Sequence, residues 1–194
     1  MFNMMSMILS VIIDWAIIIL IILCFWAIYQ IYKEEVKFIP LKDDVIIPTK
    51  EKENAGYDIY ANFEEENLVI KPHETVLVPT KLSTIFPSDY VMLLRERGST
   101  GSKGMALRAG VVDSNYRGEI FVGITNTNNI PIVITKEKDK EILSEDYIVY
   151  PYEKAIAQAI FVRLFDIKTT VGTKEDLEQN KTSRGTGALG SSGK

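Results

Sequence analysis

The chain has 194 residues, a formal net charge of −4, one Cys and one His. This length suits one domain with an appendage, and the slightly acidic balance disfavours a nucleic-acid partner, since gripping phosphates requires a basic face. A single Cys excludes an intramolecular disulfide framework and a Cys-cluster zinc site, and a single His excludes His-pair metal centres and disfavours a His-based triad. We therefore expect small ligands and a chemistry of carboxylates, hydroxyls, arginines and backbone groups.

Residues 1–32 differ in composition from the rest of the chain. They contain neither Lys nor Arg and one acid, Asp14, whereas every Gly and Pro lies after residue 32. The apolar stretch 7–29 would be about 34 Å long as a helix, against a hydrocarbon core of about 30 Å. Asp14 costs about 3 kcal/mol at mid-membrane and less in the outer third of a span. We predict one transmembrane helix within an anchor of residues 1–32.

Two alternatives stay open for this segment. One is a start-site error, in which case the cellular protein begins near Glu34 and is soluble in the cytoplasm. The other is a cleaved signal peptide, which the missing positive n-region and the missing small-residue cleavage site disfavour. For an anchor, Lys33 and Lys37 follow the span and no basic residue precedes it, so the positive-inside bias places the following domain in the cytoplasm.

The part from residue 33 to 171 is a succession of short β-rich runs punctuated by Pro, Gly, Asn and Asp. The predicted strands are VKFI (36–39), DVII (44–47), LVI (68–70), TVLVPT (75–80), YVMLLRE (90–96), GEIFVGIT (118–125), IPIVIT (130–135), DYIVY (146–150) and AIAQAIFVRL (155–164). Strands this short, without amphipathic helices between them, indicate an antiparallel sandwich, jelly roll or barrel. The charged segments 51–54 and 136–141 are predicted as solvated loops or hairpin tips. We predict an all-β domain over 33–171.

Residues 172–194 are polar and rich in Gly and Ser, and we predict a flexible C-terminal arm. Gly185, Gly187 and Gly190 have the spacing of a dinucleotide-binding fingerprint, but that motif needs a preceding strand and a following helix, which this position does not offer. An arm of this kind can instead cradle a polyphosphate, because Gly backbones approach closely and Arg184 supplies a two-point donor.

Five segments carry the remaining chemical signal, in this order. They are NAGYDIYA (54–61), RGSTGSK (97–103), GVVDSNYRG (110–118), which is predicted as a β-hairpin with Asp113 at its turn, Ala157-Gln158, and RGTGALGSSG (184–193). Together they resemble the five ordered motifs of the trimeric dUTP pyrophosphatase (dUTPase) family, over about residues 36–193. The resemblance implies a distorted jelly-roll subunit, a homotrimer with active sites shared between subunits, and closure of each site by the arm. It also implies Mg²⁺-dependent hydrolysis of dUTP to dUMP and pyrophosphate, which limits uracil in DNA and supplies dUMP.

The resemblance assigns a role to each matching residue. Asp113 is the general base, Tyr116 packs under the deoxyribose and excludes a 2′-hydroxyl, and Asp58 orients waters on Mg²⁺, with support of the neighbouring hairpin as its alternative role. Backbone groups pair with the uracil edge at Gly110, Val111 and Val112. The phosphates are contacted by the second and fourth motifs at Arg97, Gly98, Ser99 and Gln158. The arm contributes Arg184, Leu189, Gly190 and Ser191. Substrate and Mg²⁺ both point to a catalytic domain in the cytoplasm.

Two motifs depart from the family pattern. The second motif commonly reads Arg-Ser-Gly, and here it reads Arg97-Gly98-Ser99, which displaces the hydroxyl by one residue. Leu189 stands where the arm usually has an aromatic ring over uracil, so stacking worth about 1 kcal/mol is lost. The stretch 130–150 is longer than in short family members, and KEKDKEILSED is predicted as an extended hairpin tip.

Two other functions are compatible with this family resemblance. A dCTP deaminase of the same fold would carry a glutamate ten residues after Asp113, and position 123 is Gly. A non-catalytic, dUTPase-like regulatory module is the other, and the intact Asp113, Tyr116 and Arg184 argue against it. Hydrolysis of dUTP is therefore the expected activity.

Overall fold

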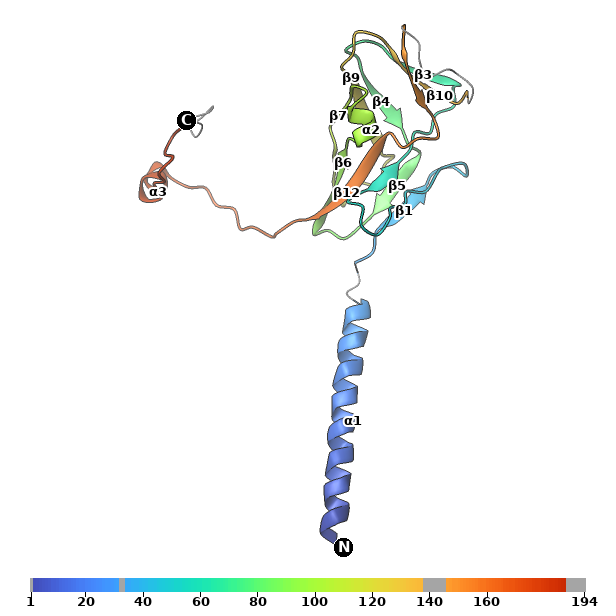
Figure 1. The fold of residues 1–194 in the computed structure, drawn as a ribbon. Coiled ribbons are helices and arrows are strands. Elements are labelled where there is room, and N and C mark those ends of the chain that lie inside the picture. The colour runs from blue at the N-terminus through green and yellow to red at the C-terminus, as the bar shows by residue number, and fades with distance from the viewer. Residues whose placement is uncertain (1, 32–33, 138–145, 188–194) are drawn as a thin grey trace. The chain divides into compact units, whose positions relative to one another are not determined.

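The computed structural model describes residues 2–31, 34–137 and 146–187. Its first element is helix α1 (Phe2–Ile31), which Figure 1 shows as one long continuous helix. Apolar side chains point outward on all its sides between Met7 and Tyr29, and none of that stretch is buried inside the protein. The predicted helix is thus present, and it is the one helix of the described residues that is long and apolar enough to cross a membrane. That it does cross one stays a prediction.

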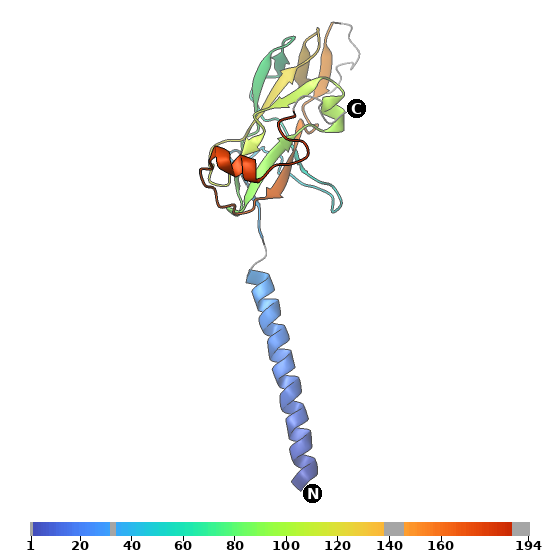
Figure 2. The same ribbon diagram turned by 90° about the vertical axis from the view of Figure 1, so that its left-hand side faces the viewer.

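The described residues from 34 to 164 form twelve short strands and the helical turn α2. The elements are β1 (Lys37–Pro40), β2 (Tyr57–Ile59), β3 (Asn67–Ile70), β4 (Thr75–Pro79), β5 (Leu82–Ile85), β6 (Tyr90–Arg95), α2 (Gly98–Gly101), β7 (Met105–Arg108), β8 (Val111–Val112), β9 (Phe121–Asn126), β10 (Ile132–Thr135), β11 (Ile148–Pro151) and β12 (Ala157–Arg163). Figure 2 shows these strands crossing at different angles instead of lying in one extended sheet. The predicted all-β fold class is confirmed.

The strands form four small sheets around a common core. Their orders are β1-β5, β11-β10-β3, β2-β12-β6-β8 and β4-β9-β7. Buried side chains from every strand except β1 and β8 meet in this core, among them Ile59, Ile70, Met92, Ile124 and Ile134. Burying one such side chain stabilises the fold by about 1.5–3 kcal/mol. The core therefore supports every strand that borders the candidate site.

Strand β12 shows how the core fixes a polar side chain at the surface. Ala157 and Ala159 are buried, and successive side chains of a strand point to opposite faces. Gln158, which lies between them, consequently faces away from the core. Its neighbour across the β12–β2 ladder is Asp58, so a carboxylate and an amide share one face of this sheet.

The predicted strand at 44–47 is wrong. This segment forms no strand: Val45 packs on the core, whereas Ile46 and Ile47 are more than two-fifths exposed. The contact of Val45 with the core holds this segment in place without any pairing to a neighbouring strand. The run DVII therefore follows the surface as a loop. It is tied there by Asp44, whose carboxylate accepts a hydrogen bond of 3.2 Å from the Asn62 amide.

The predicted hairpin at 110–118 is also wrong. Strand β8 pairs with β6, whereas β9 pairs with β4 and β7, so the chain between them crosses from one sheet to another. The turn itself is present, because the N–H of Tyr116 donates to the carbonyl of Asp113 over 3.1 Å. Asp113 therefore lies on a loop between two sheets.

The prediction of an extended hairpin tip after residue 135 fails for a different reason. Strands β10 and β11 pair in parallel, with Ile132 opposite Ile148, and a hairpin can join only antiparallel strands. A parallel pair needs a connection of about a dozen residues, which accounts for the extra length of this stretch. Most of KEKDKEILSED, residues 138–145, lies outside the described residues.

A small polar cluster ties the chain after α1 to the end of β12. The Tyr90 hydroxyl donates to the Glu34 carboxylate, which also faces Arg163 at 3.8 Å. Arg163 pairs in turn with Asp89, Nε to Oδ2 at 3.1 Å, and the bond to Glu34 raises the pKa of Tyr90. These groups are exposed or only partly buried, so they add little stability. They do place the start and the end of the β domain at one edge.

A second compact unit comprises residues from Phe165 to Lys194. It contains the short helix α3 (Lys174–Gln179), which the composition did not predict. A capping box explains its start: the Thr173 hydroxyl accepts the N–H of Asp176, whose carboxylate accepts the N–H of Thr173. The described side chains from Phe165 to Thr186 are exposed, and the predicted domain boundaries at 32 and 171 stay a prediction.

Candidate active site

One pocket on the β domain is polar. This polar pocket has a volume of about 380 Å³ and is lined by Asn54, Ala55, Gly56, Asp58, Arg97, Gly98, Ser99 and Gln158. Its walls come from the loop before β2, the turn after β6, and β12. Five residues predicted from three distant segments thus meet in one place: Asp58, Arg97, Gly98, Ser99 and Gln158.

An ion pair organises the polar pocket. Arg97 Nε lies 2.9 Å from Asp58 Oδ1, and Arg97 Nη2 donates to Asp58 Oδ2 over 3.1 Å. Two parallel charge-assisted bonds fix the plane of a guanidinium as well as its position. Both side chains are about one-third exposed, which leaves the remaining N–H groups of Arg97 open to a ligand. The nearest further contacts of Nη1 are long, at 3.5 Å to Ser99 Oγ and to the Ala155 carbonyl.

The buried side chain of Thr100 fixes the turn that carries Arg97. This side chain is buried, and its hydroxyl accepts the Arg97 N–H and donates to the Arg97 carbonyl, each over 3.0 Å. Gly98 and Ser99 are consequently exposed at the pocket, and a Cβ at Gly98 would meet nothing within 4 Å. Position 98 can therefore take a serine without a clash, and the departure from the family's second motif has no steric cause.

Gln158 is fixed by contacts on two sides. Its Nε2 donates to the Glu96 carbonyl over 2.8 Å. A Cβ at Gly56 would lie 3.0 Å from Gln158 Oε1, so a glycine at this position leaves room for the amide.

The sequence analysis did not single out Tyr150. This side chain is fully buried, and its hydroxyl donates to the Ala155 carbonyl over 2.7 Å. Burial raises the pKa of Tyr150, and Ser99 and Arg97 oppose this effect.

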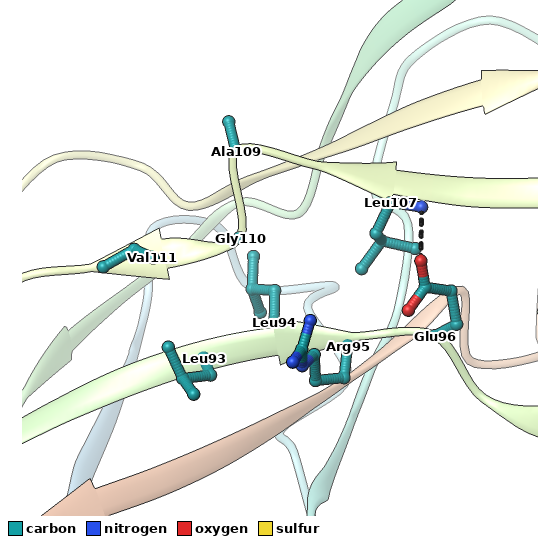
Figure 3. Close-up of a pocket in the computed structure, with 8 residues that line it drawn as sticks. All are labelled: Leu93, Leu94, Arg95, Glu96, Leu107, Ala109, Gly110 and Val111. Atoms are coloured by element: carbon teal, nitrogen blue, oxygen red, sulfur yellow. Dashed lines mark hydrogen bonds between the residues drawn. The ribbon is translucent and has the colours of Figure 1, made fainter. Parts of the chain in front are cut away.

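A second pocket lies between β6 and the chain from β7 to β8. This strand pocket (Figure 3) has a volume of about 280 Å³ and is lined by Leu93, Leu94, Arg95, Glu96, Leu107, Ala109, Gly110 and Val111. Gly110 presses its backbone against β6, since its carbonyl accepts the Leu94 N–H over 2.7 Å. A Cβ at Gly110 would lie 2.5 Å from the Leu94 carbonyl oxygen, so only glycine fits. The predicted positions Gly110 and Val111 therefore border a cavity through their backbone.

Glu96, which the sequence analysis did not single out, lies at one end of the strand pocket. Its carboxylate accepts the Leu107 N–H over 2.9 Å (Figure 3), and this bond is the largest cause that lowers the pKa of Glu96. The only sequence signal was its place directly before Arg97. Neither its charge nor its spacing distinguished it from a solvated glutamate.

The other predicted residues of the third motif lie on the loop that follows β8. Val112 is half-buried and pairs with Met92, whereas Asp113 is exposed. Within the described ranges the Asp113 carboxylate has no hydrogen-bond or ion-pair partner. Neither pocket is lined by Asp113 or Tyr116.

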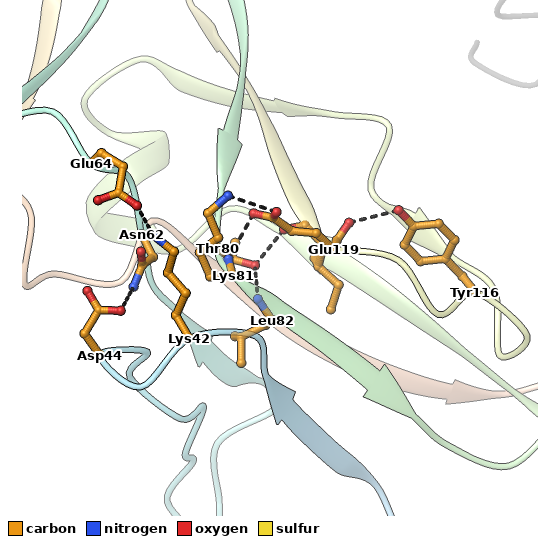
Figure 4. A network of polar contacts seen from close by, with 10 residues as sticks. Lys42, Asp44, Asn62, Glu64, Thr80, Lys81, Leu82, Tyr116 and Glu119 are labelled. Atoms are coloured by element: carbon orange, nitrogen blue, oxygen red, sulfur yellow. Dashed lines mark hydrogen bonds and ion pairs between the residues drawn. The ribbon is translucent and has the colours of Figure 1, made fainter.

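Tyr116 is held against its own loop. Its hydroxyl donates to the Glu119 carbonyl over 2.9 Å (Figure 4), and its side chain is partly exposed. A Cβ at Gly118 would lie 2.4 Å from the Tyr116 hydroxyl oxygen, so this glycine lets the ring fold back. Glu119 is itself fixed by Lys81, whose N–H and Nζ both donate to its carboxylate over 3.1 Å.

The arm residues are described by themselves. Arg184 donates from Nε to the Gly187 carbonyl over 3.0 Å within the unit that begins at Phe165. The predicted positions Leu189, Gly190 and Ser191 lie outside the described residues. Among those that are described, no group of three or more His, Cys, Asp or Glu side chains could hold a metal ion.

Comparison with known proteins identifies relatives of one kind. The family model described as dUTPase matches residues 43–139. The deoxyuridine 5′-triphosphate nucleotidohydrolase of Fusobacterium nucleatum is 32% identical over 166 residues, which are 84% of this chain and 99% of that protein. That of Neisseria meningitidis serogroup A is 34% identical over 155 residues, 77% of this chain and 89% of its own.

Solved structures of phage enzymes share the fold. The dUTPase of Staphylococcus bacteriophage 80alpha with dUPNHPP superposes with a TM-score of 0.61 at 23% identity, over 82% of this chain and 99% of that one. A mutant dUTPase from phage phi11 of S. aureus, whose structure concerns the coordination of a structural Mg(II) ion, gives 0.57 at 22% identity over 73% and 99% of the two chains. At this identity the likeness establishes the arrangement of strands.

Proposed function

The chain belongs to the dUTPase family, an enzyme family that hydrolyses dUTP, and we propose that the polar pocket, the strand pocket and the loop of Asp113 carry out this reaction here. The observation that supports the assignment most is the polar pocket, where Asp58, Arg97 and Gln158 converge from three distant segments. The products are dUMP and pyrophosphate. A cationic, amide-rich cavity suits the anionic phosphates, and a backbone-lined slot suits a flat base.

We propose that the polar pocket binds the phosphates. Arg97 offers N–H groups that its bond with Asp58 holds in a fixed plane, and Ser99 and Gln158 offer a hydroxyl and an amide beside it. An arginine held in this way loses little side-chain entropy when a phosphate binds. Arg184 of the arm, with Leu189, Gly190 and Ser191, supplies further contacts to the substrate.

We assign the base and the sugar to the third motif. Backbone groups from Gly110 to Val112 pair with the uracil edge, and Tyr116 lies under the deoxyribose, where its ring excludes a 2′-hydroxyl. Asp113 takes a proton from the water that attacks the α-phosphorus. Its exposure and its lack of a partner within the described residues leave the carboxylate available for this role.

The side chains present fit a magnesium ion that is bound mainly through the substrate. Mg²⁺ prefers oxygen ligands and keeps several waters, and protein sites often add only one or two carboxylates to the phosphate oxygens. Asp58 provides such a carboxylate at the polar pocket, and the described residues offer no larger cluster. When bound, the ion would neutralise charge on the phosphates. Asp58 would hold it through water.

We propose a homotrimer with shared active sites. In one chain Asp113 and Tyr116 line neither pocket, so the general base and the phosphate pocket are separate parts of the surface. A neighbouring copy can bring the loop of one subunit to the polar pocket of another. The expected mass in solution is that of three chains plus detergent.

Assay of the purified full chain in detergent tests the activity. With Mg²⁺ present, dUTP, UTP, dCTP and dTTP are offered separately, and pyrophosphate and ammonia are measured. We expect pyrophosphate from dUTP alone. Ammonia from dCTP would indicate a deaminase, and no product from any of the four would indicate a non-catalytic binding module.

We further propose that α1 anchors the enzyme in a membrane with its β domain in the cytoplasm. Support comes from the 23-residue stretch Met7–Tyr29, whose mean hydropathy is 3.0. A helix that is apolar all round needs either a protein core or lipid around it. In a trimer the three spans would meet, and Asp14 could face its partners instead of lipid.

Alkaline carbonate extraction and protease digestion of intact cells test the anchor. The full chain should stay in the membrane pellet, and its β domain should be protected from protease added outside. A soluble product whose mass begins near residue 34 would instead show a start-site error. The sequon Asn180-Lys181-Thr182 reports an exported arm in a glycosylating host.

A further inference from the structure

Glu96 lines one pocket and bonds a residue that lines the other. Its carboxylate lines the strand pocket and accepts the Leu107 N–H over 2.9 Å (Figure 3). Its backbone carbonyl accepts Nε2 of Gln158 over 2.8 Å, and Gln158 lines the polar pocket. The next residue in the chain is Arg97. One residue thus lines the cavity assigned to the base, bonds one side chain assigned to the phosphates and directly precedes another.

The bond from Glu96 to Leu107 joins elements that no ladder joins. Strand β6, which ends at Arg95, pairs with β12 and β8, whereas β7 pairs with β9 in another sheet. Between the end of β6 and β7, the carboxylate therefore replaces a missing backbone pairing. It joins the two walls at one end of the strand pocket, and the bond from the Leu94 N–H to the Gly110 carbonyl joins them near β8.

The carboxylate is suited to this task because it is ionised. The Leu107 N–H holds its pKa below the usual range, and the nearby cations Arg95 and Arg108 act in the same direction. A charged acceptor makes a stronger bond to an N–H than a neutral one does. The side chain is only half-buried, so the core does not depend on it for stability.

We propose that Glu96 is a positioning residue that keeps the base pocket and the phosphate pocket of one subunit in binding geometry. This rests on the proposed function, which assigns those pockets. The interactions it supports are made before the reaction as well as during it, so its loss should raise KM and leave kcat nearly unchanged. A residue that served folding alone would lower both the Tm and the active fraction, and would not change KM.

Three full-chain variants in detergent test the proposal. Glu96→Ala removes the acceptor, and Glu96→Gln keeps an oxygen that can accept the Leu107 N–H. Glu74→Ala is the matched control, because the Glu74 carboxylate also accepts a backbone N–H over 2.9 Å, that of Lys71, and lines neither pocket. We expect Glu96→Ala to raise KM for dUTP about tenfold with kcat within about twofold, and Glu96→Gln to stay within about threefold of the parent.

Three further measurements are made on the same proteins. Binding of deoxyuridine and binding of inorganic pyrophosphate, each followed by calorimetry, should both weaken in Glu96→Ala. Hydrogen exchange at the Leu107 amide should be faster in that variant and near the parent rate in Glu96→Gln. An unchanged KM in Glu96→Ala, or a Gln variant as impaired as the Ala variant, would overturn the proposal. If the parent chain does not hydrolyse dUTP, the proposed function fails, whereas the binding and exchange measurements still decide the role of Glu96.

Discussion

Asp58 and Arg97 form a two-point ion pair, with Nε to Oδ1 at 2.9 Å and Nη2 to Oδ2 at 3.1 Å, across the mouth of the polar pocket. This pair gives Asp58 a role before any metal binds, since it fixes the plane of the arginine. The structural role that the sequence left as an alternative for Asp58 therefore concerns Arg97, and a water-held Mg²⁺ is compatible with it.

Asp58→Asn should raise KM for dUTP several-fold, because the amide keeps the shape of the carboxylate but loses the charge that orients Arg97. Asp89→Asn is the control, since it breaks an Asp–Arg pair of similar length, with Arg163, away from both pockets. Titration with Mg²⁺ separates the two roles of Asp58. If the Asn variant needs a higher Mg²⁺ concentration for half-maximal activity, Asp58 helps to hold the ion; if that concentration is unchanged, orientation of Arg97 is the whole role of Asp58.

Asp113→Asn should lower kcat by about 10²–10⁴ while the trimer and nucleotide binding persist, which is the usual contribution of a positioned general base. The measurement is steady-state turnover beside calorimetric binding of a non-hydrolysable dUTP analogue. Asp43→Asn makes the same chemical change at an exposed carboxylate that lines neither pocket, and it should be silent. Full turnover in Asp113→Asn would move the general base elsewhere, with Asp58 next in line.

Tyr116→Ala should raise the kcat/KM for UTP relative to dUTP by about tenfold, because it removes the ring that we propose excludes the 2′-hydroxyl. Gly118→Ala provides an independent test: its Cβ would lie 2.4 Å from the Tyr116 hydroxyl, so the ring must move. We expect this variant to relax sugar selection as well. Selection that persists in both variants would be due to the backbone.

Truncation after Ser183 should leave the Tm nearly unchanged and abolish most turnover. The described arm residues from Phe165 to Thr186 are exposed and contribute little to the core. The segment that the truncation removes contains Arg184 and the Gly-rich motif. Closure of such a segment excludes water and completes a site. Arg184→Ala should reproduce much of the loss of turnover, and Lys181→Ala should not.

Leu189→Phe should lower the Kd for dUTP, because it restores an aromatic ring that can stack over uracil. A weaker Kd would show that the leucine packs differently.

The stability that Glu96 contributes should vanish in acid. Its pKa in the folded protein lies below its ordinary value of about 4.3, so the contribution is fully present above that pH and is lost as the pH falls through the folded value. The Tm of the parent should thus exceed that of Glu96→Gln slightly at pH 7, and the difference should shrink as the pH falls below the ordinary carboxyl range. Circular dichroism in the β-sheet region is the measurement. Tryptophan fluorescence would not report on the β domain, because both tryptophans lie in α1. A difference independent of pH would argue against an ionised Glu96.

The sequence predicted most of the longer strands, as short β-rich runs bounded by Pro, Gly, Asn or Asp. It failed where pairing decides the outcome. Segment 44–47 is as β-prone as many strands but has no partner, and β5 and β7 have unremarkable sequences that acquire structure from β1 and β9. The parallel pairing of β10 and β11 follows from long-range packing, which no local pattern encodes.

The candidate site divides in the same way. Arg97, Ser99 and Gln158 could be predicted because their segments carry glycines and hydroxyls in a recognisable order. Glu96 and Tyr150 could not, because each acts through a backbone group that only the folded turns bring into reach: the Leu107 N–H for the first and the Ala155 carbonyl for the second. A carboxylate bonded to a backbone N–H leaves no trace in composition or spacing.

The cluster of Glu34, Tyr90 and Arg163 leaves only a short connection between α1 and the β domain. Helix α1 ends at Ile31 and the cluster begins at Glu34, so at about 3.6 Å per residue at most about 11 Å of chain separates them. If α1 spans a bilayer, this short connection keeps the β domain close to the lipid headgroups. Such an enzyme diffuses in two dimensions, and its encounters with other membrane-bound proteins scale with the area of the membrane instead of the volume of the cell.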